Sequence, residues 1–184
     1  MGILFTVISA YFITRRFLIE GGIFLFIGAI CDSFDGAVAR KSGRVTKFGA
    51  FLDSSLDRIS EIFIFFAIFF YFRFSHTAFS FTFEWITILT MGVSLLISYV
   101  KARVEGLGKN CKVGLLQRQY RLILLIFSII LSGLLNPYLS KSSSAKYLMD
   151  LPLKISLLFL LIGGIYTVAQ RFNRAFEVLA NKRR

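Results

Sequence analysis

The stretch "CDSFDGAVARKSGRVTKFGAFLDSSLDR", residues 31–58, holds four of the chain's five aspartates between two long apolar runs. Asp32 and Asp35 are three residues apart at the end of the first run, and Asp53 and Asp57 are four apart at the start of the second. Spacings of three and four place each pair on one face of a helix. Because the polar segment between them turns the chain back, we predict that two helices bring the four carboxylates together at one depth.

The composition is that of an integral membrane protein. The 184 residues are 56% hydrophobic and 16% aromatic, whereas soluble domains are usually about 45–50% apolar. A spanning helix needs about 20 mostly apolar residues. The sequence therefore predicts an all-α bundle of six transmembrane helices in one domain, residues 1–184. The predicted helices cover 2–14, 17–39, 48–73, 84–107, 117–139 and 151–176.

The first predicted helix opens at the start of the sequence and is too short to cross a bilayer. We therefore expect that the natural chain continues upstream, that Met1 is an internal methionine, and that the first helix is truncated here.

The basic residues predict how the helices are oriented. The net charge is +12, and alternating helices place 15 of the 22 lysines and arginines on the side that carries residues 40–47. The positive-inside rule assigns that side to the cytoplasm. We expect a multi-pass protein of the cell membrane whose aspartates face the cytoplasm. The charge indicates contact with anionic headgroups rather than with nucleic acid.

Four carboxylates at one place repel each other unless cations lie between them. Magnesium and manganese ions prefer carboxylate oxygen, and two such ions can hold a phosphate or pyrophosphate. We predict that Asp32, Asp35, Asp53 and Asp57 form a two-metal site for Mg²⁺ or Mn²⁺.

Small and basic residues near the aspartates fit a phosphate ligand. Gly36 and Gly49 would let a ligand approach the backbone closely. Arg40 lies one helical turn after Gly36, where its planar guanidinium could hold a phosphate.

Three other interpretations remain open at this point. The acids could be solvated helix ends, with Asp53 near a helix start. Carboxylates in a membrane bundle could also serve a divalent-cation transporter, although these cluster toward one side. A membrane scaffold without activity is the third.

The window reads Asp32-x-x-Asp35-Gly36-x-x-Ala39-Arg40, eight residues, then Gly49-x-x-x-Asp53-x-x-x-Asp57. It resembles in full the signature of the CDP-alcohol phosphotransferases, a family with six membrane helices and this motif on the second and third. The resemblance implies metal-dependent transfer of a phosphatidyl group from a CDP-linked lipid, either CDP-diacylglycerol or an ether analogue, to an alcohol, with release of CMP.

The resemblance also implies a role for each motif residue. Asp32, Asp35 and Asp53 would hold metal, and Asp57 would join the second ion and act as general base on the acceptor hydroxyl. The nucleotide would be bound by Gly36, Arg40, Thr46 and Gly49.

Other segments resemble the branch that makes phosphatidylinositol phosphate and its archaeal ether-lipid counterpart. These are "FLDSSLDRISE" at 51–61, "SYVKARVEGLG" at 98–108 and the "VGLLQR" that follows. The resemblance implies inositol phosphate as acceptor, with glycerol 3-phosphate as the alternative. The basic residues expected to bind its phosphate are Lys101, Arg118, Arg121 and Arg171.

The chain departs from that branch at 116–121. Members usually carry an Ile-Glu-Arg-Pro-Glu-Arg run there, and this chain reads Leu-Gln-Arg-Gln-Tyr-Arg. The arginines remain, and we expect them to lack the carboxylate partners of that run. The family also implies a homodimer, and the aromatic stretch 62–72 could face either lipid or a partner subunit.

Overall fold

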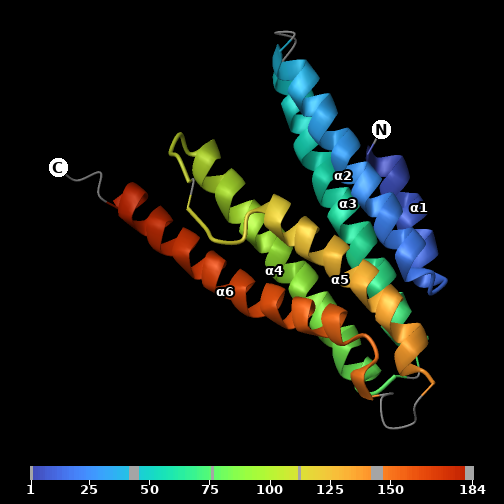
Figure 1. The fold of residues 1–184 in the computed structure, drawn as a ribbon. Coiled ribbons are helices and arrows are strands. Elements are labelled where there is room, and N and C mark those ends of the chain that lie inside the picture. The colour runs from blue at the N-terminus through green and yellow to red at the C-terminus, as the bar shows by residue number, and fades with distance from the viewer. Residues whose placement is uncertain (1, 42–45, 76, 112, 142–146, 181–184) are drawn as a thin grey trace.

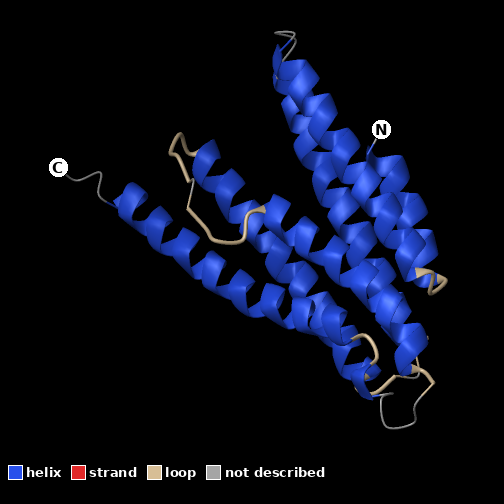
Figure 2. Ribbon diagram, in the orientation of Figure 1, coloured by secondary structure: helices blue, strands red, loops and turns tan. Residues whose placement is uncertain are grey.

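The computed structural model describes residues 2–41, 46–75, 77–111, 113–141 and 147–180, with the side chains of 35–41 and 180 left out. The described residues form helices and connecting segments and contain no strand, as Figure 2 shows. The all-α prediction is confirmed. The helices are α1 (Gly2–Thr14), α2 (Leu18–Lys41), α3 (Lys47–Arg73), α4 (Ser80–Gly106), α5 (Arg118–Leu139) and α6 (Leu151–Ala180).

Two helix ends differ from the sequence prediction by four residues, and the others differ by at most two. Helix α4 begins at Ser80, because Phe79 with φ of 62° breaks the helical path and the apolar face already includes buried Phe83. Helix α6 continues to Ala180, into the basic tail. There Arg174 and Glu177 form an i,i+3 ion pair of 3.1 Å on the helix surface, a pairing that favours helix.

Three of these helices, α4, α5 and α6, are long and apolar enough to cross a membrane. Helix α1 has 13 residues, and α2 and α3 carry the aspartates and several basic residues in their sequences. The prediction of six helices is confirmed, and length and composition alone support three of them as membrane spans among the described residues.

The helices spread apart toward one end of the bundle (Figure 1). The C-terminal ends of α2 and α4 and the start of α3 lie at the spread end, and the C-terminal ends of α3 and α5 lie at the opposite, closed end. Helix α1 packs on α2 and α3, α4 on α3 and α6, and α5 on α2 and α6. The fully buried core residues include Ile68, Phe72, Ile129, Leu153 and Leu157.

The aromatic stretch 62–72 divides between two environments. Phe65 and Phe72 are buried in the core, whereas Phe63, Phe66 and Phe70 are each more than 40% exposed. The exposed row has the composition expected of a surface that meets lipid or another subunit.

A buried polar cluster ties the closed end together. Asp150, fully buried, precedes α6, and its Oδ1 accepts hydrogen bonds from Tyr71 Oη at 2.5 Å and Asn136 Nδ2 at 2.7 Å. The Asp150 backbone N–H donates to Asn136 Oδ1 at 3.0 Å. A buried carboxylate is tolerated only with such donors. The cluster therefore joins α3, α5 and the start of α6.

We predict that Asn136→Ala lowers the midpoint of thermal unfolding in detergent and reduces the free energy of unfolding by about 1–3 kcal/mol. The reason is that Asp150 loses one hydrogen-bond donor and one acceptor. Asn110→Ala, at an exposed position, is the control and should unfold like the wild type. Equal midpoints for all three proteins would show that the cluster does not stabilise the fold.

Candidate active site

Residues 46–49 fix the start of α3. Thr46 is the N-cap, and its Oγ1 accepts a hydrogen bond from the Gly49 N–H at 2.9 Å. This satisfies one of the unpaired donors of the first helical turn. A Cβ at Gly49 would lie 3.0 Å from Thr46 Oγ1, so the structure gives both residues a capping role. Their predicted contact with a nucleotide stays a prediction.

The structure brings three of the predicted aspartates to one cavity of about 350 Å³ between α2, α3 and α5. Asp32, Asp53 and Asp57 line it together with Arg118. The remaining motif residues, Asp35, Gly36 and Arg40, lie in the last turns of α2, and their side chains are outside the described residues.

Helix α1 closes on this site at its first residue. A Cβ at Gly2 would lie 1.8 Å from Asp32 Oδ1, so any side chain there would displace the aspartate. The start of α1 therefore packs directly against Asp32.

Arg118 links the aspartates of two helices. Its Nη1 lies 2.6 Å from Asp57 Oδ1, and its Nη2 lies 3.8 Å from Asp32 Oδ2. The side chain is one-third exposed, and that of Asp57 is 16% exposed. Arg118 was predicted from sequence for the acceptor phosphate, and here it pairs with the proposed metal and base carboxylates.

The carboxylate oxygens of this site are ligands that suit a hard divalent cation. Carboxylate oxygens are the ligands that Mg²⁺ and Mn²⁺ prefer, and Asp32 and Asp57 already share one positive charge, the guanidinium of Arg118. Among the described side chains no three acids, histidines or cysteines are grouped closely enough to hold an ion, and Asp35 is outside that comparison.

A second cavity, of about 1190 Å³, adjoins the first and reaches α4 and α6. Asp53, Asp57 and Arg118 line both cavities. The larger cavity is also lined by the other three basic residues predicted for the acceptor, namely Lys101, Arg121 and Arg171. The structure therefore gathers all four cations beside the carboxylates.

Lys101 and Arg171 each have partners other than the aspartates that Arg118 contacts. Lys101 is partly exposed, and its Nζ lies 3.8 Å from Glu105 Oε1 on the next turn of α4. Arg171 is 5% exposed, and its guanidinium donates to the backbone carbonyls of Ile97 and Val113. Arg171 is thus fixed by the main chain around it.

The partner of Arg121 is Glu61, a residue that the sequence analysis missed. Arg121 is 3% exposed, and its Nε and Nη2 donate to Glu61 Oε1 at 3.2 and 3.0 Å. The same oxygen accepts from Ser94 Oγ at 2.5 Å. Glu61 follows Asp57 by four residues on the same helical face, and this spacing was the available signal.

The two α5 arginines lack the acids of the related run, but they do have carboxylate partners. Helix α3 supplies the partners from far along the sequence, Asp57 for Arg118 and Glu61 for Arg121. Both partner acids lie on α3, four residues apart.

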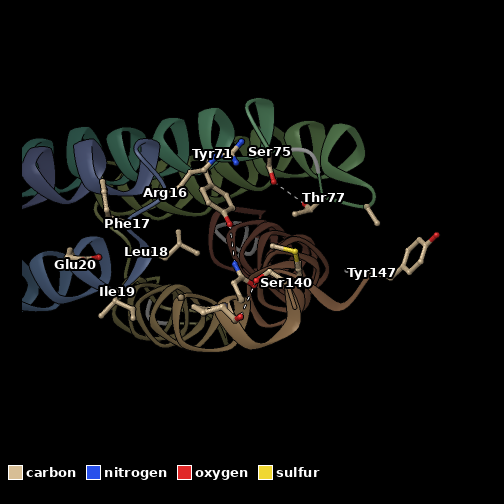
Figure 3. A pocket seen from close by; sticks show the side chains of 15 residues that line it. Arg16, Phe17, Leu18, Ile19, Glu20, Tyr71, Ser75, Thr77, Ser140 and Tyr147 are labelled. Atoms are coloured by element: carbon tan, nitrogen blue, oxygen red, sulfur yellow. Dashed lines mark hydrogen bonds between the residues drawn. The ribbon is translucent and has the colours of Figure 1, made fainter. Parts of the chain in front are cut away.

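A third cavity lies at the closed end of the bundle (Figure 3). It measures about 830 Å³ and is lined by Arg16 of the α1–α2 turn, by Tyr71 and Ser75, and by Tyr147 before α6. None of the residues predicted for the site is among the described residues that line it. The candidate active site is thus confined to the spread end.

We predict that Arg118→Gln raises the affinity for Mn²⁺ by about tenfold, because a fixed positive charge beside Asp57 and Asp32 opposes a second cation. Manganese titration followed by electron paramagnetic resonance measures this directly. Arg103→Gln, an exposed arginine of α4, is the matched control and should leave the affinity unchanged. Weaker binding of Mn²⁺ to Arg118→Gln would contradict the idea that the Arg118 charge opposes the metal ion.

Comparison with known proteins shows the family of this chain. A family model described as CDP-alcohol phosphatidyltransferase matches residues 1–169. The archaetidylinositol phosphate synthase of Methanothermobacter thermautotrophicus is 39% identical over 121 residues, which are 66% of this chain and 58% of that protein. The phosphatidylinositol phosphate synthase of Mycobacteroides abscessus is 33% identical over 156 residues, 85% of this chain and 64% of that protein. The chain thus spans about three-fifths of the length of these curated relatives.

A solved structure has the same fold. The phosphatidylinositol phosphate synthase of Mycobacterium tuberculosis, crystallised with CDP-DAG bound, superimposes with a TM-score of 0.77 at 26% identity, over 95% of this chain and 82% of that chain. A second crystal structure of that protein contains manganese and citrate.

Proposed function

Because this chain belongs to the CDP-alcohol phosphatidyltransferase family, we propose that it transfers a phosphatidyl group from a CDP-linked lipid, CDP-diacylglycerol or an ether analogue, to inositol phosphate and releases CMP. One observation carries the proposal. Asp53, Asp57 and Arg118 line both cavities of the site. The smaller cavity is lined by three aspartates of the signature, and the larger one is also lined by Lys101 and Arg171. Such a cavity suits an anionic acceptor next to a reacting pyrophosphate.

In the proposed reaction, the acceptor hydroxyl attacks the phosphorus that carries the lipid. A new phosphate ester bond forms, the phosphoanhydride bond breaks, and CMP leaves. Asp57 takes the hydroxyl proton as general base. A carboxylate is a weak base, so the orientation of the hydroxyl by Asp57 contributes more to the rate than its basicity does. Arg118, paired with Asp57 at 2.6 Å, keeps that carboxylate in place.

Asp32, Asp35, Asp53 and Asp57 would hold Mg²⁺ or Mn²⁺ in a two-metal site. When bound, the ions would supply positive charge that neutralises the pyrophosphate. The manganese complex of the Mycobacterium tuberculosis protein supports this assignment. Gly36, Arg40, Thr46 and Gly49 would contact the nucleotide at the α2–α3 turn.

The proposed acceptor is a phosphorylated alcohol, because the larger cavity is lined by basic residues. Lys101, Arg118, Arg121 and Arg171 line one cavity, and four cations there suit a dianion better than an uncharged alcohol. The names of the curated relatives favour inositol phosphate. Glycerol 3-phosphate carries the same group and is the alternative acceptor.

The setting follows from the same assignment. We place residues 1–184 as one membrane domain of a multi-pass protein of the cell membrane. The spread end faces the cytoplasm, where the excess of basic residues lies. A homodimer could use the exposed row of Phe63, Phe66 and Phe70.

We predict that CMP is released from CDP-diacylglycerol in nanodiscs with Mn²⁺ when inositol phosphate is added. Glycerol 3-phosphate should be a weaker acceptor, and inositol and serine should release little, because they leave the cationic cavity uncompensated. Liquid chromatography of CMP measures each rate. Release driven equally by uncharged inositol would overturn the phosphate assignment. Manganese transport without CMP release would favour a transporter.

We predict that Asp57→Asn reduces turnover about 10²-fold to 10⁴-fold, because the amide cannot accept the proton. Binding of CDP-lipid, measured by isothermal titration with Mn²⁺, should be largely retained. Glu177→Gln, which changes an exposed acid of the α6 tail, is the control and should turn over normally. Substantial turnover in Asp57→Asn would exclude Asp57 as the base.

A further inference from the structure

Glu61 is a partly buried acid that the proposed reaction does not use. Its side chain is 12% exposed, and it lies one turn beyond Asp57 on the same face of α3. Its Oε1 accepts hydrogen bonds from Arg121 Nε and Nη2 at 3.2 and 3.0 Å and from Ser94 Oγ at 2.5 Å. One oxygen therefore joins α3, α4 and α5, and its partner Arg121 lines the larger cavity.

The guanidinium of Arg121 keeps donors that these contacts do not use. An arginine has five N–H groups in a planar fork. The hydrogen bonds described here take one N–H each from Nε and Nη2, toward Glu61, and one from Nη1, toward the Leu116 carbonyl at 3.0 Å. One N–H remains on Nη1 and one on Nη2. Arginine often binds a phosphate through a pair of N–H groups, and Arg121 keeps one on each of its terminal nitrogens.

The burial of Arg121 makes its orientation depend on Glu61. Arg121 is 3% exposed and lines the larger cavity together with Asp53 and Asp57. Burial of an arginine, which always carries its charge, is costly unless the charge is paired, and a side chain already ordered in the fold loses little entropy when it binds a ligand. Arg118, by contrast, is one-third exposed and pairs with Asp57.

We infer that Glu61 is a positioning residue of the acceptor site, which aims the two unused N–H groups of Arg121 at the phosphate of the acceptor and is assisted in this by Ser94. The inference rests on the proposed function, since it names the acceptor phosphate as the ligand of Arg121. It assigns Glu61 a task that differs from those of the four aspartates.

A buried ion pair can instead serve stability alone, and the chain contains a buried acid for comparison, whose arginine partner is 58% exposed. Glu84 is 6% exposed, and its Oε2 lies 3.7 Å from Arg73 Nη1 near the closed end. Neither residue lines the cavities described above. Glu84→Gln thus removes a comparable charge away from the site.

The test measures initial rates of CMP release against inositol phosphate concentration at saturating CDP-diacylglycerol. Glu61→Gln should raise the KM for inositol phosphate about tenfold, with kcat changed less than about threefold and the KM for CDP-diacylglycerol unchanged. Glu61→Asp, which keeps the charge, should lie between wild type and Glu61→Gln. Glu84→Gln should leave all three parameters unchanged. An unchanged KM for inositol phosphate in Glu61→Gln overturns the inference.

A double-mutant cycle separates positioning from a general effect on the fold. If Glu61 acts through Arg121, then Glu61→Gln should not raise the KM further in an Arg121→Gln background. Independent, multiplying effects would overturn the inference. If Glu61→Gln fails to fold, Ser94→Ala removes only one donor to Oε1 and should raise the KM about twofold to threefold; no rise there would also overturn it.

Binding without turnover distinguishes this inference from the proposed function. Isothermal titration of inositol phosphate should show about tenfold weaker binding to Glu61→Gln than to wild type. A wild-type protein that releases no CMP with any acceptor would refute the proposed function. An active wild type whose inositol phosphate affinity survives Glu61→Gln would refute only the role of Glu61.

Discussion

The spread end of the bundle depends on charges that face each other across it. Asp57 and Glu61 are one turn apart on α3, and Arg118 and Arg121 are one turn apart on α5. Long arginine side chains reach across the space where these helices diverge, since α5 packs mainly on α2 and α6. A bundle held only by apolar contacts would close such a space, because burial of apolar area rewards contact. The ion pairs keep the cavities polar and connect α3 to α5 across the space between them.

The closed end makes this opening possible. Its core of Ile68, Phe72 and Leu157 is fully buried, and Asp150 fastens Tyr71 and Asn136 at the ends of their helices. Lys154 adds to this, since its Nζ donates to the carbonyls of Ala78 and Met149 at 2.9 and 2.8 Å. Stability is concentrated where no predicted site residue lies. Cavities, charges and partly exposed side chains are concentrated at the other end, which is the distribution expected when binding elements come from the less stable part of a fold.

Local patterns in the sequence predicted what depends on local geometry. The helices followed from apolar runs, and the aspartate pairs from spacings of three and four. Glu61 escaped prediction because its partners Ser94 and Arg121 lie 33 and 60 residues away, and nothing in a single sequence fixes such pairings. Asp150 was overlooked for the same reason, since its partner Tyr71 is 79 residues away. Thr46 was read as a ligand contact, whereas its position at a helix start also predicts a cap.

The residues that line both cavities of the site suggest how the two substrates meet under the proposed function. Asp53, Asp57 and Arg118 line both cavities, and displacement at phosphorus requires the attacking and leaving oxygens to lie roughly in line. Under the proposed function, a pyrophosphate at the aspartates and an acceptor among the cations would approach these three residues from different sides. The proton acceptor, Asp57, is one of the three, and Arg118 touches it from α5 at 2.6 Å. Arg121, set back and fixed by Glu61, would hold the acceptor phosphate away from the reacting phosphorus. Separation of the two anions in this way avoids the repulsion between their charges.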